Sequence, residues 1–400
     1  MTKSLHVGLN LVFLVPGETG GMETYARELI GALVREAPNV EFTAFINREA
    51  ASAGNGPWCE LIRSVTVPVA ARNRFEWVRA EQQLLPFLAR RASVDLMHSL
   101  ATTAPIWGDF GRVTTVHDLH YRICPETHSP LRGLGMRLLV PLVAARSHRI
   151  ISVSQNTAND LVRLLGVPKE KIDIVPHGLG ANPTVAPISE NEIRTRLAIG
   201  PRRVVLTFSA KRPHKNLMRL LEALALIPST RRPVLILPGY PTPHEEELKS
   251  RAVALGVEDD TRFLGWVDAS WREGLYQASS AFVFPSLYEG FGLPVLEAMR
   301  RGVPVACSNR GALREVAGDG ALVFDPEEPR AIATAMERLL NQPDEVERLR
   351  RAAEAHISKF TWQATARGTL AAYERTLDAV SISKKSHGTS PNAAAQVKLS

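Results

Sequence analysis

The chain has 400 residues, of which 45% are hydrophobic and 22% are charged, and its formal net charge is +7. A single hydrophobic core rarely extends over such a length, so two domains of ordinary globular composition are expected. Its three cysteines lie far apart, which excludes a disulfide framework and the usual zinc spacings and suits a reducing compartment. The apolar run at residues 11–15 is too short for a signal peptide or a membrane span, so we expect a cytoplasmic protein.

Short β-rich runs alternate with helical patterns along the chain, which is typical of parallel α/β sheets. We therefore predict an α/β fold with two doubly wound, Rossmann-like domains. The predicted strands of the first half are residues 5–9, 42–46, 94–97, 113–116, 150–153 and 172–175, and those of the second half are residues 204–208, 234–237, 262–264, 281–284 and 303–306.

The boundary between the predicted domains lies near residues 178–201. Asn182-Pro183 interrupts regular structure there, and Ser189 with Glu192 forms a capping box that predicts a short helix. After Trp362 a last helical pattern gives way to small polar residues, which are typical of disorder. The prediction is a first domain over 1–180, a linker over 181–200, a second domain over 201–358, a last helix over 359–380 and a disordered tail over 381–400.

A glycine-rich turn, residues 16–23, follows the first predicted strand and precedes an amphipathic helical pattern. Gly20 and Gly21 let the backbone approach a diphosphate or an acceptor closely. The turn lacks the Gly-x-Gly core of the dinucleotide fingerprint, which argues against an NAD-dependent oxidoreductase. An ordinary tight turn is the alternative interpretation.

His117 and Asp118 come directly after predicted strand 113–116, at the carboxyl end where α/β sheets bind ligands. A histidine there can donate a hydrogen bond to a sugar hydroxyl or take part in proton transfer, with Asp118 orienting its ring. A purely structural histidine is the alternative.

A basic segment with Lys211, Arg212 and Lys215 follows the first predicted strand of the second half. Cations there suit a donor with two phosphates, because negative charge grows on the leaving phosphate as the bond breaks. A solvated basic turn is the alternative.

The segment 284–304 places Glu289 and Glu297 eight positions apart around a Gly-Phe-Gly turn, directly after a buried strand. Pro294 suits the first turn of a helix, so Glu289 falls in the preceding loop and Glu297 in the first turns. Amides at the helix N-terminus favour a phosphate, and the carboxylates suit sugar hydroxyls. The segment therefore predicts a nucleotide-sugar site, and an ordinary strand–loop–helix is the alternative.

This segment resembles the signature of the retaining glycosyltransferases of family 4, also called group 1, in which two glutamates flank the sequence Gly-Phe-Gly-Leu-Pro. The resemblance implies the GT-B fold: two Rossmann-like domains facing across a cleft, and a C-terminal helix that crosses back to the first domain. The Gly20-Gly21 turn resembles the Gly-Gly-x-Glu turn of the same family. The His-Asp-Leu sequence at His117 and the Pro-His-Gly sequence at 176–178 resemble bacterial mannosyl- and related hexosyltransferases of surface polysaccharide synthesis.

The resemblance also implies roles for individual residues. His117, Lys215 and Glu289 are the expected catalytic residues, with Lys215 gripping the diphosphate and Glu289 holding the transferred sugar. Glu297 is expected to bind the ribose hydroxyls. The other expected donor-binding residues are Gly20, Gly21, Lys211, Arg212, Phe291, Gly292, Leu293 and Glu315.

The chain departs from the common family pattern ahead of the lysine. Ser209-Ala210 stands where the family has Gly-Arg, so either Lys211 or Arg212 is expected to supply that cation. No Asp-x-Asp pair occurs in the chain, and we therefore expect no metal and no other cofactor. Lys215 and helix N-termini would then neutralise the diphosphate.

The positive charge is concentrated in two stretches. Residues 72–91 hold five arginines against two glutamates, and residues 112–149 hold six arginines against two acidic residues, an excess that equals the whole net charge. Both stretches mix arginine with apolar residues, which is typical of helices on an anionic membrane surface. A helix packed on its own domain with a solvated basic face is the alternative, and no nucleic-acid partner is expected.

The predicted function is the transfer of a hexose from a nucleotide-diphosphate-sugar to a hydroxyl of a glycan or lipid-linked glycan, with retention. GDP-mannose is the first candidate donor. A non-catalytic nucleotide-sugar-binding protein on the same fold is the alternative. The expected location is the cytoplasm, at the inner face of the plasma membrane if the basic stretches bind lipid.

Overall fold

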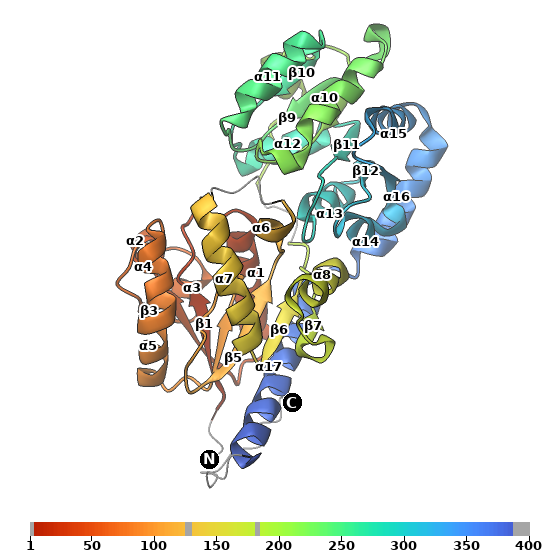
Figure 1. Ribbon diagram of the computed structural model, residues 1–400. Coiled ribbons are helices and arrows are strands. Elements are labelled where there is room, and N and C mark those ends of the chain that lie inside the picture. Colours follow the sequence, from red (N-terminus) through yellow and green to blue (C-terminus); the bar gives the residue numbers. More distant parts are fainter. Residues whose placement is uncertain (1–3, 125–129, 181–184, 387–400) are drawn as a thin grey trace. The chain divides into compact units, whose positions relative to one another are not determined.

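The computed structural model describes residues 4–124, 130–180 and 185–386, which fall into two compact units (Figure 1). Unit 1 holds residues 4–122, 130–180 and 361–386 of these, and unit 2 holds residues 123–124 and 185–360. Each unit is built around its own parallel sheet. This confirms the predicted pair of Rossmann-like domains.

The sheet of unit 1 has seven parallel strands in the order β3-β2-β1-β4-β5-β6-β7. The order reverses at β1, which lies between β2 and β4. Every residue of β1 is buried, as expected of a strand covered on both faces. The strands are β1 (His6–Leu11), β2 (Glu41–Ile46), β3 (Arg63–Thr66), β4 (Leu96–Ser99), β5 (Gly111–Val116), β6 (Arg149–Ser152) and β7 (Ile172–Ile174).

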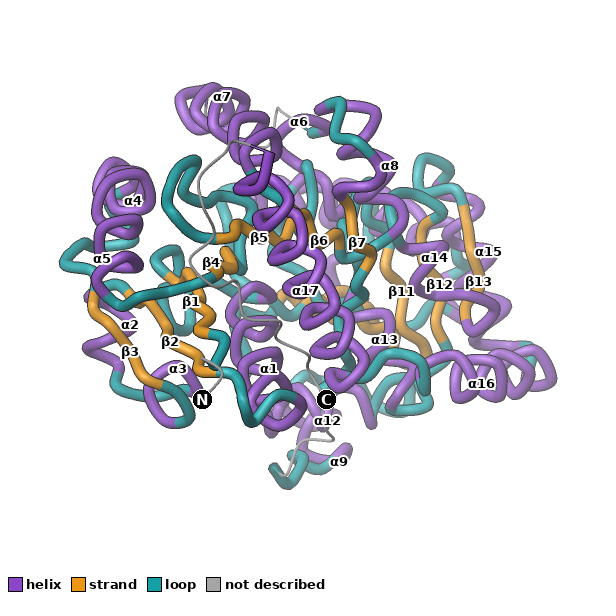
Figure 2. The backbone as a smooth tube through the Cα atoms, turned by 90° about the horizontal axis from the view of Figure 1, so that it is seen from below, coloured by secondary structure: helices purple, strands orange, loops and turns teal. Residues whose placement is uncertain are grey.

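Helices cover both faces of this sheet (Figure 2). One face carries α4 (Arg74–Arg79), α5 (Leu85–Arg91) and α7 (Pro130–Arg146), and the other carries α1 (Gly21–Glu36) and α3 (Pro57–Glu60). A π-helical segment joins α4 to α5, so residues 74–91 form one continuous helical stretch. The other helical elements are the π-helix η1 (Ala80–Leu84), α2 (Arg48–Ala53), α6 (His120–Ile123), α8 (Gln155–Leu165) and the 3₁₀ turn η3 (Lys169–Lys171).

The last helix, α17 (Trp362–Ser386), belongs to unit 1, as predicted. It contacts α1 and the strands β5, β6 and β7, and it buries Thr369 and Tyr373. The helix continues to Ser386, so the predicted tail beginning at residue 381 starts too early. Small polar residues are weaker helix formers, but they can extend an existing helix because each added residue contributes one more backbone hydrogen bond. The remaining predicted tail, 387–400, lies outside the described residues.

The sheet of unit 2 has six parallel strands in the order β10-β9-β8-β11-β12-β13. The chain moves outward from β8 through β9 to β10, and then crosses back to β11 on the other side of β8. The four residues of β11 are all buried, which agrees with its unbroken apolar sequence. The strands are β8 (Val204–Leu206), β9 (Val234–Leu237), β10 (Thr261–Phe263), β11 (Ala281–Phe284), β12 (Val305–Ser308) and β13 (Ala321–Phe324).

Two helices of unit 2 begin where the sequence predicts. The Ser189 side chain accepts a hydrogen bond from the Glu192 amide at 3.2 Å and starts the first of them. Pro294 lies in the first turn of α13, again as predicted. The helical elements are α9 (Glu190–Arg196), η4 (Pro213–Lys215), α10 (Leu217–Leu226), η5 (Ser229–Arg231), α11 (His244–Ala254), η6 (Glu258–Asp260), α12 (Ala269–Gln277), α13 (Leu293–Arg300), α14 (Leu313–Ala317), η7 (Gly318–Gly320), α15 (Pro329–Asn341) and α16 (Pro343–Ile357).

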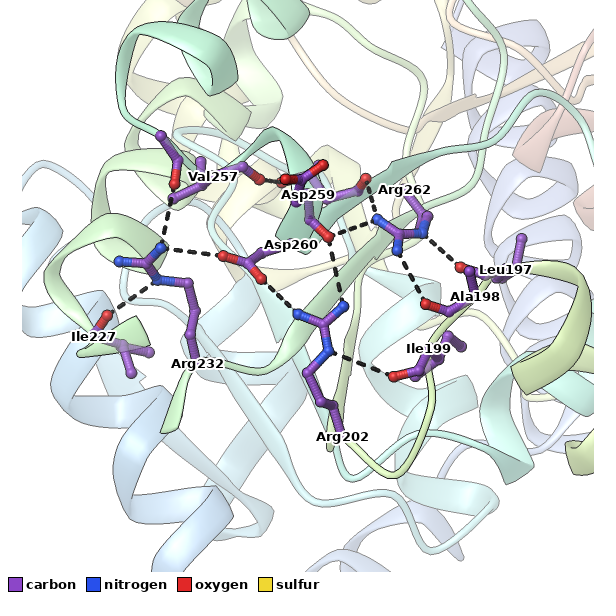
Figure 3. A network of polar contacts seen from close by, with 12 residues as sticks. Leu197, Ala198, Ile199, Arg202, Ile227, Arg232, Val257, Asp259, Asp260 and Arg262 are labelled. Atoms are coloured by element: carbon purple, nitrogen blue, oxygen red, sulfur yellow. Dashed lines mark hydrogen bonds and ion pairs between the residues drawn. The ribbon is translucent and has the colours of Figure 1, made fainter. Parts of the chain in front are cut away.

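Three arginines tie the amino ends of β8, β9 and β10 together (Figure 3). Arg202 Nη1 lies 2.5 Å from Asp260 Oδ1, and Arg232 Nη1 lies 3.1 Å from Asp260 Oδ2. Arg262 donates at 2.6 Å to the Leu197 carbonyl, in the segment that follows α9. This network fixes the end of the predicted linker at the edge of the sheet opposite to the carboxyl ends of the strands.

Candidate active site

In unit 2 the loops that follow β8 and β11 leave the sheet at the point where the strand order reverses. In open α/β sheets, ligands bind at such a point, beyond the carboxyl ends of the strands. The loop after β8 carries Lys211, Arg212 and Lys215, and the loop after β11 carries Glu289. Sheet topology therefore brings these two predicted clusters to one place.

Lys215 and Glu289 form an ion pair that joins these two loops. Lys215 Nζ lies 2.6 Å from Glu289 Oε1, and both side chains are largely buried, with exposed fractions of 18% and 16%. The ammonium also lies 5.5 Å from the centre of the Phe284 ring, within the range of a cation–π interaction. A backbone hydrogen bond from the Leu287 amide to the His214 carbonyl, 2.8 Å long, holds the loops together.

The backbone at Glu289 is fixed by the loop that follows β12. The Ala312 amide donates to the Glu289 carbonyl at 3.0 Å. The neighbouring residue, Gly311, has φ +59°, and a Cβ on it would lie 2.6 Å from the Glu289 carbonyl oxygen. Only glycine fits this conformation and this contact. The glutamate is thus held in place by its backbone as well as by Lys215.

Gly292 caps α13 with φ 113°, and the helix begins at Leu293. The amides of the first turn of a helix have no partners within the helix and attract anions. Phe291 and Gly292 are buried, and the side chain of Leu293 is half-buried. The segment 291–293 therefore places backbone amides beside the loop that holds Glu289, where the sequence predicts the donor.

Glu297 lies in the second turn of α13 and is half-buried. The Tyr276 hydroxyl donates to Glu297 Oε2 at 3.3 Å, and Arg301 Nη1 donates to the Glu297 carbonyl at 2.7 Å. Burial, together with the nearby Glu297 carboxylate, raises the pKa of Tyr276 well above its usual range, so this hydroxyl stays protonated. Glu315 is exposed on α14.

Lys211 and Arg212 differ in burial and in hydrogen bonding. Lys211 is fully buried, and its Nζ donates to the carbonyls of Gly239, at 2.7 Å, and Leu264, at 2.5 Å. These carbonyls follow β9 and β10, so the ammonium ties together the loops after three neighbouring strands. Burial lowers the pKa of Lys211 to about 8. Arg212 is exposed, which makes it the better placed of the two predicted cations.

In unit 1, His117 follows β5 and is oriented by a backbone carbonyl. Its Nε2 lies 2.8 Å from the Leu100 oxygen. Because a carbonyl only accepts, Nε2 carries the proton, and Nδ1 of the neutral ring is an acceptor. Burial lowers the pKa of His117, although the Leu100 carbonyl and Asp118 act in the opposite direction, so the ring is neutral at pH 7.

Two expectations for this histidine are therefore revised. The sequence suggested that the ring either donates a hydrogen bond to a sugar hydroxyl or takes part in proton transfer. A neutral ring whose Nε2 proton is held by Leu100 can only accept through Nδ1, which leaves the second of these roles. Asp118 accepts from the His120 amide at 3.0 Å, and the ring of His117 takes its orientation from the Leu100 carbonyl.

Aromatic rings that the sequence analysis did not assign surround His117. The Tyr25 ring packs edge-on against it at 4.9 Å between centroids, and the His177 ring at 5.3 Å. Tyr25 stacks on His177 with 4.8 Å between ring centroids, and Trp362 also stacks on His177 with 6.1 Å between centroids. These residues come from α1, from the segment after β7 and from the start of α17. The Pro-His-Gly sequence is the one signal of this cluster in the sequence.

A buried chain of hydrogen bonds supports these rings. The Tyr25 hydroxyl lies 3.1 Å from Thr115 Oγ1, which lies 2.8 Å from His98 Nε2. The other nitrogen of His98 lies 2.8 Å from the hydroxyl of Tyr373 on α17. Burial, with a smaller effect of His117, lowers the pKa of His98 to about 3, so this ring stays neutral. The C-terminal helix is thus linked to the residues that hold His117.

Gly20 and Gly21 lie at the start of α1, and both are exposed. The Glu23 carboxylate accepts from the Gly17 amide at 2.7 Å and closes the turn. A Cβ on Gly20 or Gly21 would meet no atom within 4 Å. The space beside both glycines is therefore open, and ligand binding at this turn stays a prediction.

Glu81 is a fully buried carboxyl on the π-helical segment of unit 1. Its Oε1 accepts from Asn10 Nδ2 at 2.9 Å and from Thr103 Oγ1 at 3.1 Å. Asn10 lies at the carboxyl end of β1, the strand at which the sheet order reverses. Burial raises the pKa of Glu81 to about 7, against the lowering effect of its hydrogen bonds.

Glu81 should make unit 1 less stable as the pH rises from about 4.5 to about 7, because the folded protein binds this proton more tightly than the unfolded chain. Glu81→Gln should remove that dependence, so its gain in unfolding free energy over the wild type should grow across this range, on the order of 3 kcal/mol. Urea unfolding at several pH values measures the difference. The exposed Glu354→Gln is the matched control, and a gain that does not change with pH would contradict the assignment.

Within residues 4–124, 130–180 and 185–386, no three His, Cys, Asp or Glu side chains gather in a way that could hold a metal ion. In the same part of the chain, none of the helices combines the length and the apolar character needed to span a bilayer.

Comparison with known proteins identifies the family. Residues 19–181 match the model of Glycosyltransferase Family 4, and residues 189–356 match that of Glycosyl transferases group 1. The O-antigen chain mannosyltransferase B of Escherichia coli is 34% identical over 268 residues, which cover 66% of this chain and 70% of that protein. The chain belongs to glycosyltransferase family 4.

Other glycosyltransferases match over most or part of the chain. A D-inositol 3-phosphate glycosyltransferase of Rhodococcus opacus (strain B4) is 26% identical, covering 89% of this chain and 86% of its own length. The MMP alpha-(1->4)-mannosyltransferase of Mycolicibacterium hassiacum is 32% identical over 62% of this chain and 58% of that protein.

Solved structures of similar proteins agree with the fold. Sucrose-phosphate synthase from Thermosynechococcus elongatus superposes with a TM-score of 0.74 at 21% identity, covering 94% of this chain and all of that one. Anabaena HepE in complex with UDP and glucose superposes with a TM-score of 0.69 at 19% identity, covering 92% and 99%. This family 4 protein is therefore a glycosyltransferase of the GT-B type.

Proposed function

We propose that this glycosyltransferase moves a hexose from a nucleotide-diphosphate-sugar to a hydroxyl of a glycan or lipid-linked glycan, with retention of the anomeric configuration. The observation that carries the proposal is the ion pair between Lys215 and Glu289 at the point of strand reversal in unit 2, beside the N-terminus of α13. Cation, carboxylate and helix amides are the groups that a phosphorylated sugar needs.

In this proposal the donor lies along the loops after β8 and β11. Lys215 binds the diphosphate, and the exposed Arg212 supplies the second cation. The amides of residues 291–293 and Glu289 hold the hexose, and Glu297 binds the ribose. Glu315 contributes near the nucleotide, and Gly20 and Gly21 face the diphosphate or the acceptor.

In the proposed reaction, one bond at the anomeric carbon breaks and another forms. The bond to the phosphate oxygen of the donor breaks, and a bond to the acceptor oxygen forms on the same face of the sugar. The proton of the acceptor hydroxyl passes to the departing diphosphate. Lys215 stabilises the charge that grows on this diphosphate, so it contributes more in the transition state than in the ground state.

GDP-mannose is the proposed donor because the relatives include an O-antigen chain mannosyltransferase and an MMP mannosyltransferase. We further propose that no metal takes part, since a lysine and helix amides provide the positive charge. Activity should then be unchanged by EDTA, and a loss that Mg²⁺ or Mn²⁺ restores would overturn this part. The acceptor is proposed to be carried by a membrane, with the enzyme on its cytoplasmic side.

Thermal-shift titration with GDP-, UDP- and ADP-sugars tests the donor without an acceptor. GDP-mannose at a hundred times its Kd should stabilise the protein by about 2.7 kcal/mol. A shift with UDP- or ADP-sugars alone would overturn the choice of donor, and no shift with any of them would overturn the site. Slow hydrolysis of the donor without acceptor would distinguish an enzyme from a protein that only binds nucleotide-sugars.

A further inference from the structure

The continuous helical stretch 74–91 exposes large aromatic side chains on one face of unit 1. Phe75 is 90% exposed and Phe87 is 63% exposed, although rings of this size are usually buried. Trp107 lies beside the same stretch: its indole Nε1 donates to the Gln82 carbonyl at 2.6 Å, while 53% of the residue is exposed. Rings that keep this much contact with water indicate a surface that is covered by something else.

These rings alternate with arginines along a single row. Every fourth residue from Phe75 is exposed, which gives the row Phe75, Arg79, Gln83, Phe87 and Arg91. Residues four apart are neighbours on a helix surface, so the row forms one stripe of rings and guanidinium groups. The opposite side of the stretch is buried in the core of unit 1 through Ala80, Leu85 and Ala89.

A second helix on the same face of the sheet repeats this pattern. In α7, Leu138 is 64% exposed, Leu142 is 50% exposed, and Arg146 follows at the same spacing. Val140 and Ala144 of the same helix are buried. Figures 1 and 2 both show α7 on the side of the sheet that carries α4 and α5. Residues 74–91 and α7 therefore both expose apolar side chains and arginines on the same side of unit 1.

The charge of this face is positive. Arg74, Arg79, Arg90 and Arg91 are all exposed on the stretch 74–91. Its acidic residues are directed elsewhere, since Glu81 is buried and Glu76 accepts from the Ala70 amide at 2.9 Å.

We propose that this face, made of residues 74–91 with Trp107 and the exposed row of α7, docks on an anionic lipid bilayer. Phe75, Phe87 and Leu138 enter the boundary between headgroups and acyl chains, and the arginines contact lipid phosphates. A protein partner would require a central apolar patch with a polar rim, whereas here rings and cations alternate along the row. This inference rests on the proposed function, because a membrane-borne acceptor is the reason for the enzyme to bind a bilayer.

Co-sedimentation of the full chain with vesicles, without donor, tests the surface. Binding to vesicles with a quarter phosphatidylglycerol should exceed binding to pure phosphatidylcholine by about tenfold or more and should weaken at high salt. The double variants Phe75→Ser/Phe87→Ser and Arg79→Gln/Arg91→Gln should each lose about tenfold in binding to the anionic vesicles.

Matched controls come from exposed residues of unit 2. Val253→Ser and Arg348→Gln/Arg351→Gln remove an exposed apolar side chain and two exposed charges there, and neither should change vesicle binding. Equal binding of all variants, or of both vesicle types, would overturn the proposal. So would concentration-dependent self-association that the Phe75→Ser/Phe87→Ser variant abolishes, since a second copy would then cover the face.

The donor-induced thermal shift, measured on every variant, separates this inference from the proposed function. Variants that lose vesicle binding should keep the shift, which also shows that they are folded. A protein that binds vesicles but gives no shift with any nucleotide-sugar would overturn the proposed donor site and leave the docking surface standing.

Discussion

Lys215→Ala is expected to lower kcat/KM by about 10²–10³-fold, the usual cost of removing one preorganised group that stabilises charge in the transition state. The ammonium is held within 2.6 Å of Glu289, so it is already in place when the donor arrives. Its loss also leaves the Glu289 carboxylate largely buried without its cation, which adds repulsion toward the diphosphate. Initial rates with GDP-mannose over a range of concentrations measure the effect, and binding of GDP should weaken in parallel.

Two further variants make this expectation specific. Lys249→Ala removes a lysine from a helix face of the same unit, where Lys249 pairs with Glu245 and Glu246, and it should leave the rate unchanged. Lys215→Arg keeps the charge and should recover part of the activity. A loss of less than about threefold in Lys215→Ala would mean that another cation holds the diphosphate, and Arg212 would then be the residue to replace.

Most of the fold followed from local patterns in the sequence. Short apolar runs such as 281–284 are typical of buried parallel strands, and the cap at Ser189 has a recognisable chemical signature. Two strands were missed. β3 is an edge strand whose residues are mostly exposed, so its sequence has no apolar run, and Ala321–Phe324 of β13 follows short helical turns that hide its start.

The candidate site was predictable where one short segment carries it. Glu289, Pro294 and Glu297 lie within a single loop and helix, so their spacing alone placed them correctly. The pairing of Glu289 with Lys215 depends on the strand order β8-β11, and these residues are 74 positions apart. Spacing along the chain holds no information on such a contact.

Lys211 shows a second reason why the role of a residue could not be predicted from the sequence. Its position among basic residues suggested a ligand-binding cation, but its ammonium donates hydrogen bonds to the carbonyls of Gly239 and Leu264 instead. Backbone carbonyls look alike in every sequence, so only the folded chain reveals that a cation is needed to join three loops. The rings around His117 were not predicted for a related reason: Tyr25, His177 and Trp362 come from three segments that are far apart in the sequence.

We propose that His117 acts through Nδ1 as an acceptor for a hydroxyl of the substrate, and this proposal leads to a second strong expectation, in which the two ring nitrogens are tested separately. His117→Ala should lower kcat by about 10–10²-fold, in line with the loss of one positioned hydrogen-bonding group at a reacting centre. Asparagine can place an amide oxygen where Nδ1 lies, whereas glutamine can place an amide N–H where Nε2 lies and keep the bond to Leu100. His117→Asn should therefore retain more activity than His117→Gln.

The pH profile distinguishes an acceptor at Nδ1 from a purely structural ring. Protonation turns Nδ1 into a donor, and burial holds the pKa of His117 below its ordinary value of 6.5. The wild type should therefore keep full activity at pH 7 and lose it as the pH falls through the lowered pKa. His117→Asn has no group that titrates there, so its residual activity should lack this acid limb. Equal activity of the two amide variants, with the acid limb kept in both, would show that His117 only shapes the loop at Leu100.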